Sequence, residues 1–258
     1  NNNTFIDHLD TGTAPAIYIT NDYNSLTNHI SVSNNHIIGW YYGIHGGCND
    51  LIIKNNTIED CKHSGIHLLY NSPCTIQENN VNCGIYLAKI SNVSLKDNTV
   101  SGPCIAGNGV GSGIYLTNDS ASYTTEKNTI LRNKVAGCTY GVRLYKSAGT
   151  LTTTDILYND IRYNTTPFAN SSDGTLSISY NLGYKTENTG TATISASSTS
   201  VTISHGLVAA PTKIIVTPFG NVGNCWVDYE SITATKITIH CSSAPETDTT
   251  VSWSAQVV

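Results

Sequence analysis

The sequence predicts an all-β protein in which a solenoid of stacked strands is followed by a small antiparallel β-sandwich. A short phrase that recurs about every twenty residues, with β-branched residues and no helical spacing, predicts the solenoid. A change to short alternating segments after Gly190 predicts the sandwich. The abundance of Asn, Thr, Ser, Gly and Ile suits both parts, because Thr and Ile favour pleated strands while Asn and Gly accept tight corners.

One half of the repeated phrase is apolar-x-x-Asn-x-apolar, and its asparagine marks each turn of the solenoid. Asn56, for example, follows Ile53 and precedes Ile58 at these spacings. The markers occur at intervals of 19 to 35 residues, which fit a basic turn of about twenty residues with loops inserted at some corners. The series consists of Asn3, Asn35, Asn56, Asn79, Asn98, Asn133 and Asn159.

The other half of the phrase is Gly-Ile-x-Leu, which reads as a short strand. It is complete at Gly65–Leu68 and Gly84–Leu87 and recurs, in part or in full, in the other turns. Alternation along a strand directs Ile and Leu into the core and the x position outward. We therefore expect one outward column down the coils, formed by Tyr18, His45, His67, Tyr86, Tyr115 and Arg143.

These phrases resemble the repeats of right-handed parallel β-helix proteins of the pectate-lyase-like architecture, over about residues 1–180. The resemblance implies coils of about three short strands, with asparagine amides stacked at one corner so that buried polar groups are paired. A leucine-rich repeat has a similar period, but its L-x-x-L-x-L frame is absent. The catalytic phrases of polygalacturonases and alginate epimerases, and the clustered Asp and Arg of pectate lyases, are also missing. The resemblance therefore specifies a fold rather than a reaction.

The repeat stops within Tyr180–Gly190, so the predicted domains are a β-helix over residues 1–185 and a sandwich over residues 186–258. About six strands in about seventy residues are typical of a small antiparallel sandwich. They are expected at Thr191–Ile194, Ser200–Ser204, Lys213–Thr217, Cys225–Tyr229, Lys236–Cys241 and Val251–Val257. The phrases S-V-T-I-S-H-G-L, P-T-K-I-I-V-T-P and V-S-W-S-A-Q-V resemble a C-terminal module of phage tail proteins and archaeal surface proteins.

Charge and cysteine content indicate a secreted or surface-exposed protein. Only 12% of residues are charged and the net charge is -5, so the chain has no basic stripe for nucleic acid. Eight cysteines without a CxxC pair or a zinc-type Cys/His spacing favour disulfides in an oxidising compartment. No apolar run approaches the ~20 residues of a membrane span, and no signal peptide precedes Asn1, so we expect a mature product or a fragment. Candidate N-glycosylation sites are Asn2, Asn55, Asn92, Asn118, Asn164 and Asn170.

The repeat register also predicts cysteine pairing, because equivalent corners of neighbouring coils are close enough for a disulfide. Four cysteines follow a ladder asparagine by four to six residues, and two more follow a Gly-Ile-x strand. The expected pairs are Cys48–Cys74, Cys61–Cys83 and Cys104–Cys138 within the solenoid, and Cys225–Cys241 between two strands of the sandwich.

The outward column is the candidate binding site, and two interpretations of it remain open. Flat rings at a spacing of ~4.8 Å can stack against sugar rings, or they can simply stabilise the sheet through cross-strand contacts. His45 and His67 lack a nearby carboxylate, so no metal and no cofactor are expected. Asp7, His8 and Asp10, or Glu59 and Asp60, could form a carboxylate site, but solvated corner charges explain them as well.

We therefore expect an extracellular structural or appendage protein, on a cell or virion surface, that assembles with itself and binds neutral glycans. A homo-oligomer is expected, as a filament or a trimer. The alternative is a tailspike-like polysaccharide depolymerase, either a lyase or a glycoside hydrolase, with its site in an outer groove.

Overall fold

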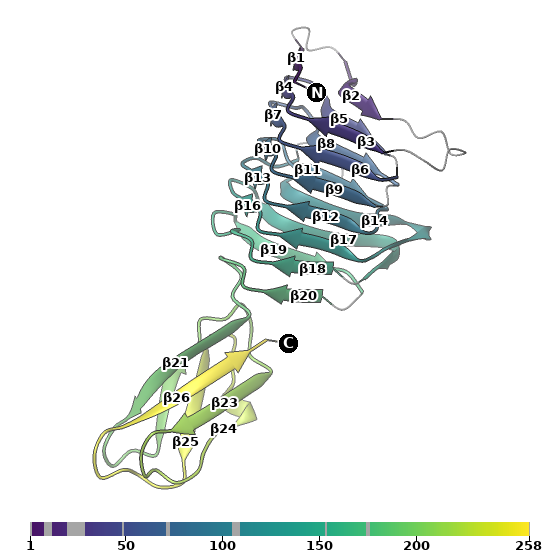
Figure 1. Ribbon diagram of the computed structural model, residues 1–258. Helices are drawn as coiled ribbons and strands as arrows, with labels where there is room; N and C mark the ends of the chain where they lie inside the picture. The colour runs from purple at the N-terminus through teal and green to yellow at the C-terminus, as the bar shows by residue number, and fades with distance from the viewer. Residues whose placement is uncertain are drawn as a thin grey trace. The chain divides into compact units, whose positions relative to one another are not determined.

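The computed structural model describes residues 2–7, 12–19, 29–47, 49–70, 73–104, 109–152, 154–173 and 176–257. The chain divides into two compact units, Asn1–Gly183 and Tyr184–Val258 (Figure 1). The first unit is a right-handed parallel β-helix, and the second is a small antiparallel β-sandwich, which confirms the predicted fold class. None of the described segments forms a helix long and apolar enough to span a bilayer.

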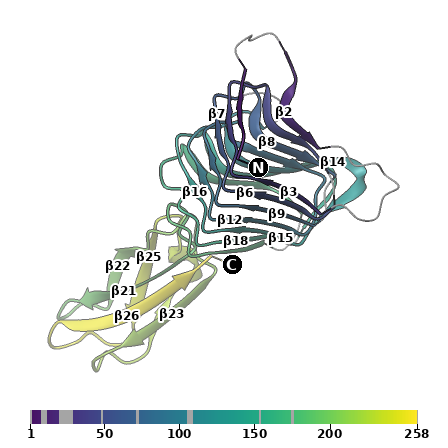
Figure 2. The same cartoon turned by 45° about the horizontal axis from the view of Figure 1, so that its top comes forward.

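Three parallel sheets form the sides of the β-helix, and each coil adds a strand to them (Figure 2). The first sheet contains β1 (Thr4–Ile6), β4 (His36–Ile38), β7 (Thr57–Glu59), β10 (Asn80–Val81), β13 (Thr99–Val100) and β16 (Lys134–Val135). The second contains β2 (Pro15–Ile19), β5 (Tyr42–Gly46), β8 (Ser64–Leu69), β11 (Ile85–Ala88), β14 (Ser112–Thr125), β17 (Tyr140–Leu151) and β19 (Thr166–Ser171). The third contains β3 (Ile30–Ser33), β6 (Leu51–Lys54), β9 (Cys74–Gln77), β12 (Val93–Lys96), β15 (Asn128–Leu131), β18 (Thr154–Leu157) and β20 (Leu176–Ser179).

The core of the helix is a set of aliphatic columns, because parallel strands in register place equivalent side chains directly above one another. In the second sheet Ile66 pairs with Ile85, which pairs with Ile114, and all three are fully buried. In the third sheet Ile53 and Ile76 are paired and buried in the same way. Each fully buried isoleucine contributes roughly 1.5–3 kcal/mol relative to an exposed one.

The asparagine ladder closes one corner of the helix. In each rung the backbone N–H and the side-chain Nδ2 both donate to the Oδ1 of the next asparagine; from Asn79 to Asn98 these distances are 3.0 and 2.9 Å. Nδ2 also donates to the carbonyl two residues earlier, as Asn98 does to Lys96 at 3.0 Å. The residue between Lys96 and Asn98 is Asp97, whose backbone is in the left-handed region at φ 57°. The ladder thus satisfies buried amides and fixes a tight corner.

Glycine begins the Gly-Ile-x-Leu strand because a neighbouring coil packs directly against its backbone. A Cβ on Gly65 would lie 2.4 Å from Val81 Cγ1 and 3.2 Å from Cys83 Sγ. Gly43 and Gly113 meet equivalent contacts with an aliphatic side chain and a cysteine sulfur. The glycines therefore make room for a column of buried thiols inside the helix.

These buried cysteines correct the predicted pairing within the solenoid. Cys61, Cys83, Cys104 and Cys138 are free thiols, so the pairs Cys61–Cys83 and Cys104–Cys138 are not formed. The Sγ atoms of Cys61 and Cys138 instead donate to carbonyls of their own coils, those of Glu59 and Ala136, at 3.8 and 3.3 Å. Cys48, the predicted partner of Cys74, lies outside the described residues.

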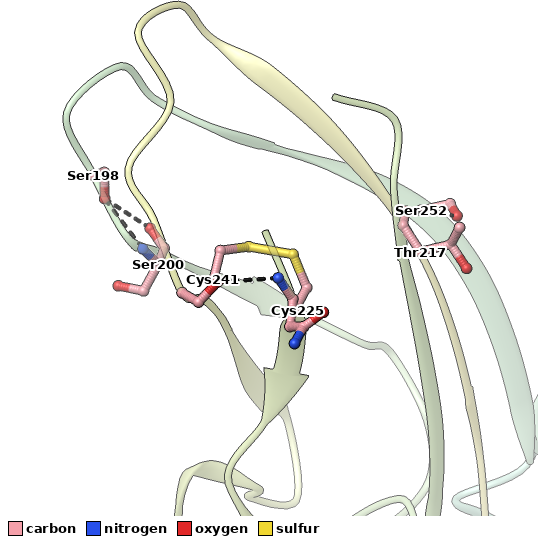
Figure 3. Close-up of a disulfide and its surroundings, with 8 residues drawn as sticks. Ser198, Ser200, Thr217, Cys225, Cys241 and Ser252 are labelled. Carbon is pink, nitrogen blue, oxygen red and sulfur yellow. Dashed lines mark hydrogen bonds between the residues drawn. A yellow bond between two sulfur atoms is a disulfide. The ribbon is translucent and has the colours of Figure 1, made fainter. Parts of the chain in front are cut away.

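The sandwich consists of two three-stranded antiparallel sheets. One contains β21 (Glu187–Ile194), β26 (Thr249–Gln256) and β23 (Lys213–Pro218) in that order. The other contains β22 (Ser200–Ser204), β25 (Lys236–Cys241) and β24 (Cys225–Val227), and the short 3-10 helix η2 (Tyr229–Ser231) follows β24. Ile194, Val222, Ile239 and Val251 are fully buried in its core. The predicted Cys225–Cys241 disulfide is present and joins β24 to β25 (Figure 3).

Candidate functional site

The outward residues of the second sheet form one column. Tyr18 pairs with His45, and His45 pairs with His67 on the next coil. The register continues through Tyr86 and Tyr115 to Arg143. Strand alternation is regular in this sheet, so the sequence pattern was sufficient to place these side chains over one another.

The middle of this column is buried, which the sequence pattern did not indicate. Tyr115 is fully buried, and His67 and Tyr86 are 7% and 8% exposed. A Cβ on Gly109 would lie 3.0 Å from the rings of both Tyr86 and Tyr115, so the chain at Gly109 covers them. These two tyrosines belong to a small buried cluster on the outer face of the second sheet, so their rings are not available to stack against a ligand.

The other end of the column, toward β2, carries a ring cluster that reaches the surface. Tyr18 is 63% exposed and stacks on His45, with ring centroids 5.5 Å apart. Tyr42 stacks on His45 at 4.5 Å and on His67 at 4.7 Å, and Tyr41 meets Tyr42 edge to face at 4.7 Å. We call this set the ring cluster; its members are Tyr18, Tyr41, Tyr42, His45, His63 and His67.

The three histidines of the ring cluster are uncharged at neutral pH. Burial, reinforced by the neighbouring histidines, lowers the pKa of His67 to about 3. Burial also lowers the pKa values of His45 and His63. The Nδ1 atoms of His45 and His67 are buried, and neither has a hydrogen-bond partner among the residues that the structure describes. In the described part of the chain, the histidines that lie beside a carboxylate are His29, His36 and His240.

Arg143 forms the opposite end of the column and is surrounded by tyrosines. Its guanidinium carbon lies 4.9 Å from the ring centre of Tyr140, 5.1 Å from that of Tyr145 and 5.4 Å from that of Tyr115. Cation–π contacts of this kind contribute about 0.5–1 kcal/mol each at partly exposed sites. Arg143 therefore packs on two rings of its own strand, β17, and on Tyr115 of the neighbouring strand β14.

The candidate acid and base residues are in separate surface contacts. Glu59 Oε2 lies 3.2 Å from His36 Nε2, which joins β4 to β7. Asp60 Oδ1 accepts a hydrogen bond from Asn82 Nδ2 at 3.3 Å. His8 and Asp10, which were considered with Asp7, lie outside the described residues. Glu59 and Asp60 thus each link neighbouring coils.

The six sequons differ in accessibility. Asn118 is fully buried, and its Nδ2 donates to the carbonyls of Tyr123 and Thr150 at 2.6 and 2.8 Å. Asn164 Nδ2 donates to the carbonyls of Val135 and Ile161 at 2.8 and 3.0 Å. Neither amide is free to accept a glycan in the folded protein. The exposed sequon asparagines are Asn2, Asn55, Asn92 and Asn170.

One set of polar and aromatic residues was missed by the sequence analysis. Trp226, Asp228, Tyr229 and His240 gather at one edge of the sandwich, beside a groove of about 430 Å³ that Trp226 and Tyr229 line. Trp226 and His240 come from β24 and β25, strands whose pairing only the fold establishes. The W-V-D-Y segment is the signal in the sequence, but its alternation by itself predicts only part of a strand.

Solved structures similar to this chain include three phage tailspikes. The Gp54 tailspike of Acinetobacter baumannii bacteriophage AP22, solved in complex with capsular saccharide, is 9% identical, with a TM-score of 0.39 and coverage of 92% of this chain and 59% of that chain. Gp49 of Pseudomonas phage LKA1 is 11% identical, with a TM-score of 0.26 and coverage of 94% and 64%. Gp49 of A. baumannii bacteriophage Fri1, a capsular polysaccharide depolymerase, is 8% identical, with a TM-score of 0.26 and coverage of 87% and 66%. The chain thus spans under two thirds of each tailspike. No curated protein matches it by sequence.

The sequence profile of a family described as periplasmic copper-binding protein (NosD) matches residues 2–231. The described residues do not fit a copper site. No group of three or more His, Cys, Asp or Glu side chains among them is arranged to hold a metal. The rings of His63 and His67 stack on each other, with their centroids 5.1 Å apart. Burial raises the pKa of the Cys138 thiol to about 11, so this thiol keeps its proton, whereas a metal ligand must be a thiolate. The match nevertheless covers most of the chain, and the protein belongs to the NosD family.

Proposed function

We propose that this protein is an extracytoplasmic β-helix protein that binds neutral glycans through the exposed side of the ring cluster, without cleaving them. The observation that carries this proposal is the pair formed by Tyr18 and Tyr42, which both stack on His45 at the solvent-facing end of the column. A sugar presents a flat C–H face that packs on such rings, and each aromatic contact contributes about 0.5–1.5 kcal/mol beyond the area it buries.

The uncharged state of the surface favours a neutral ligand. His45, His63 and His67 have lowered pKa values and carry no charge at neutral pH. The chain as a whole has a net charge of -5, so an acidic polysaccharide is repelled rather than attracted at long range.

A location outside the cytoplasm is supported by three observations. The sandwich contains a disulfide, which persists in oxidising compartments. The family description names a periplasmic protein. The sequons at Asn2, Asn55, Asn92 and Asn170 are exposed, as glycosylation would require. We propose a cell or virion surface as the place where glycans are met.

Self-assembly is part of the same proposal. Strands β1, β2 and β3 lie at the edges of their sheets and are paired on one side in the described part of the chain. Such edges accept a further strand, from this protein or another. A filament or a trimer should then be detected by light scattering and negative-stain imaging of the purified protein, whereas dispersed monomers at high concentration would contradict it.

Binding is tested by titrating neutral oligosaccharides into the wild-type protein and into a Tyr18→Ala variant. Removal of this largely exposed ring should weaken binding about tenfold without lowering the melting temperature, because ~1.4 kcal/mol corresponds to a factor of ten. Tyr163→Ala is the matched control, because Tyr163 is exposed to a similar degree but lies outside the ring cluster. Unchanged binding by Tyr18→Ala would refute the assignment of this surface.

The alternative, a polysaccharide depolymerase, is tested with the same substrates. Incubation with a panel of polysaccharides, followed by assays for reducing ends and for unsaturated products, should detect no cleavage. Release of either product would replace the binding proposal with a hydrolase or a lyase.

A further inference from the structure

The sandwich carries an aromatic groove that is separate from the ring cluster of the β-helix. It lies where β23 and β24, the edge strands of the two sheets, come together. Its volume is about 430 Å³. The lining includes Ile214, Val216, Val227 and Ile232 as aliphatic residues and Trp226 and Tyr229 as aromatic ones.

The exposure of these residues divides the groove into an anchored part and an accessible part. Ile214, Val216 and Val227 are partly buried and pack against the sandwich core. Trp226 is 43% exposed and Tyr229 is 89% exposed. The aliphatic residues therefore attach the groove to a rigid core, while the two aromatic residues remain open to solvent.

Trp226 is held in a defined orientation by polar and ring contacts. Its Nε1 donates to Asp228 Oδ1 at 2.9 Å, and its ring stacks on His240 across the sheet at 5.9 Å and 21°. Asp228 Oδ2 lies 3.4 Å from His240 Nε2, so one carboxylate contacts both rings. A ring fixed before binding loses little rotational freedom on binding, which is the usual condition for a good ligand platform.

The disulfide provides a second constraint on this platform. β24 is only three residues long, and Cys225 is bonded to Cys241 with a Cα–Cα distance of 4.2 Å (Figure 3). The next pair in the same ladder is Trp226 and His240. The disulfide thus fastens the short edge strand at the residue beside the tryptophan.

We propose that Trp226, Asp228 and Tyr229 form a binding site for a neutral sugar residue of a glycan chain. The indole offers a flat apolar face for the C–H side of the sugar ring. A carboxylate has about four acceptor positions, so Asp228, whose side chain is 56% exposed, retains capacity for sugar hydroxyls after binding the indole N–H.

The chemistry of the groove argues against charged ligands. Asp228, together with Glu230 on η2, places negative charge beside it and disfavours phosphate, sulfate and uronate groups. A quaternary ammonium group requires a cage of several aromatic faces, whereas Trp226 and Tyr229 are the two aromatic residues that line this groove. A neutral sugar is therefore the ligand class that fits best.

The test uses the chain of residues 1–258 and isothermal titration with neutral hexasaccharides of glucose, mannose, xylose and N-acetylglucosamine. Trp226→Ala and Tyr229→Ala should each weaken the sandwich site at least tenfold while leaving the melting temperature unchanged. Phe219→Ala is the matched control, because Phe219 is 67% exposed on the same sandwich but does not line the groove. Reduction of the disulfide in the folded protein should also weaken this site.

Comparison with Tyr18→Ala separates this site from the proposed one on the helix. If both sites bind, each single variant weakens one of two binding events at least tenfold and leaves the other unchanged, and the double variant weakens both. A single binding event that Trp226→Ala weakens and Tyr18→Ala does not would support the sandwich site and refute the helix site, and the reverse result would overturn the present inference. The proposal of a neutral-sugar site would also be overturned if choline or polygalacturonate bound in a Trp226-dependent way while no neutral sugar bound. The absence of any glycan binding would overturn it as well.

Discussion

Asn159 donates to Asn181 twice: its backbone N–H and its Nδ2 both lie 2.9 Å from Asn181 Oδ1. This is a further rung of the ladder, one coil beyond the last that the sequence analysis recognised. Ile178 stands three residues before Asn181 as the phrase requires, but Gly183 replaces the apolar residue two positions after it. The β-helix therefore continues through β20 to Gly183.

The ladder should be energetically important at its centre. Asn98→Ala removes the acceptor for both donors of Asn79. It also removes one of the two donors to Asn133 Oδ1, the Asn98 Nδ2, while the backbone N–H of residue 98 still donates there. Because buried unsatisfied polar groups cost roughly 1–3 kcal/mol each, we expect the free energy of unfolding to fall by about 2–5 kcal/mol, measured by chemical denaturation. Asn80→Ala, at an exposed strand position of the adjacent coil, should change it by less than about 0.5 kcal/mol.

The glycine at the start of the second-sheet strand should not tolerate a methyl group. Gly65→Ala places Cβ 2.4 Å from Val81 Cγ1, so the coils must separate locally, and overpacking of this kind costs about 1–3 kcal/mol. Gly12→Ala is the control, since among the described residues its Cβ would meet its nearest contact, the backbone N of Ala14, at 3.7 Å. Equal melting temperatures for the two variants would contradict the close packing described for Gly65.

Acid should destabilise the β-helix through the ring cluster. The folded pKa of His67 is about 3, whereas its unfolded value is near 6.5, and His45 and His63 are shifted in the same direction. Between these values the unfolded chain binds protons that the folded chain excludes. The free energy of unfolding should therefore fall as the pH drops below about 6.5, by up to ~1.4 kcal/mol per pH unit from His67, and His45 and His63 act in the same direction.

The replacement His67→Phe keeps a ring in the column but removes the titrating group, so it should make this pH dependence shallower. Asn80→Ala, at an exposed position of the first sheet, removes no titrating group and should leave the dependence as steep as in the wild type. Urea denaturation at several pH values from 4 to 8 measures both slopes. A wild-type stability that is constant over this range would contradict the assignment of neutral, buried imidazoles.

The thiols inside the helix should be inert in the folded protein. Burial raises the pKa of Cys138 to about 11 and also raises that of Cys104, while the contact with Cys83 and burial raise that of Cys61. Because the thiolate is the reactive species, a disulfide reagent at pH 8 should label these cysteines only after denaturation. Rapid labelling of Cys138 in the native state, located by peptide mass spectrometry, would contradict this expectation.

Features that arise from local alternation could be predicted from the sequence. The spacing around Asn56 and Asn79 encodes a corner in every coil, and the Gly-Ile-x-Leu phrase encodes which side chains face the core. In both cases a single strand or corner contains the whole signal, because side chains alternate with a period of two and the corner needs only an asparagine beside one left-handed residue. For Cys225 and Cys241 the sequence predicts a bridge between two sandwich strands, and the fold places the two residues directly opposite each other on β24 and β25.

The tertiary structure alone decided which rings of the column are buried and which cysteines remain thiols. Tyr86 and Tyr115 occupy the outward position that the pattern assigned to them, yet the chain at Gly109 covers their rings. Cys61 and Cys83 lie on neighbouring coils as predicted, but they remain thiols within the packed interior. The contact of Trp226 with Asp228 and His240 likewise depends on which strands pair. These features depend on how loops and coils pack in space, and a pattern within one strand contains no information about what lies across from it.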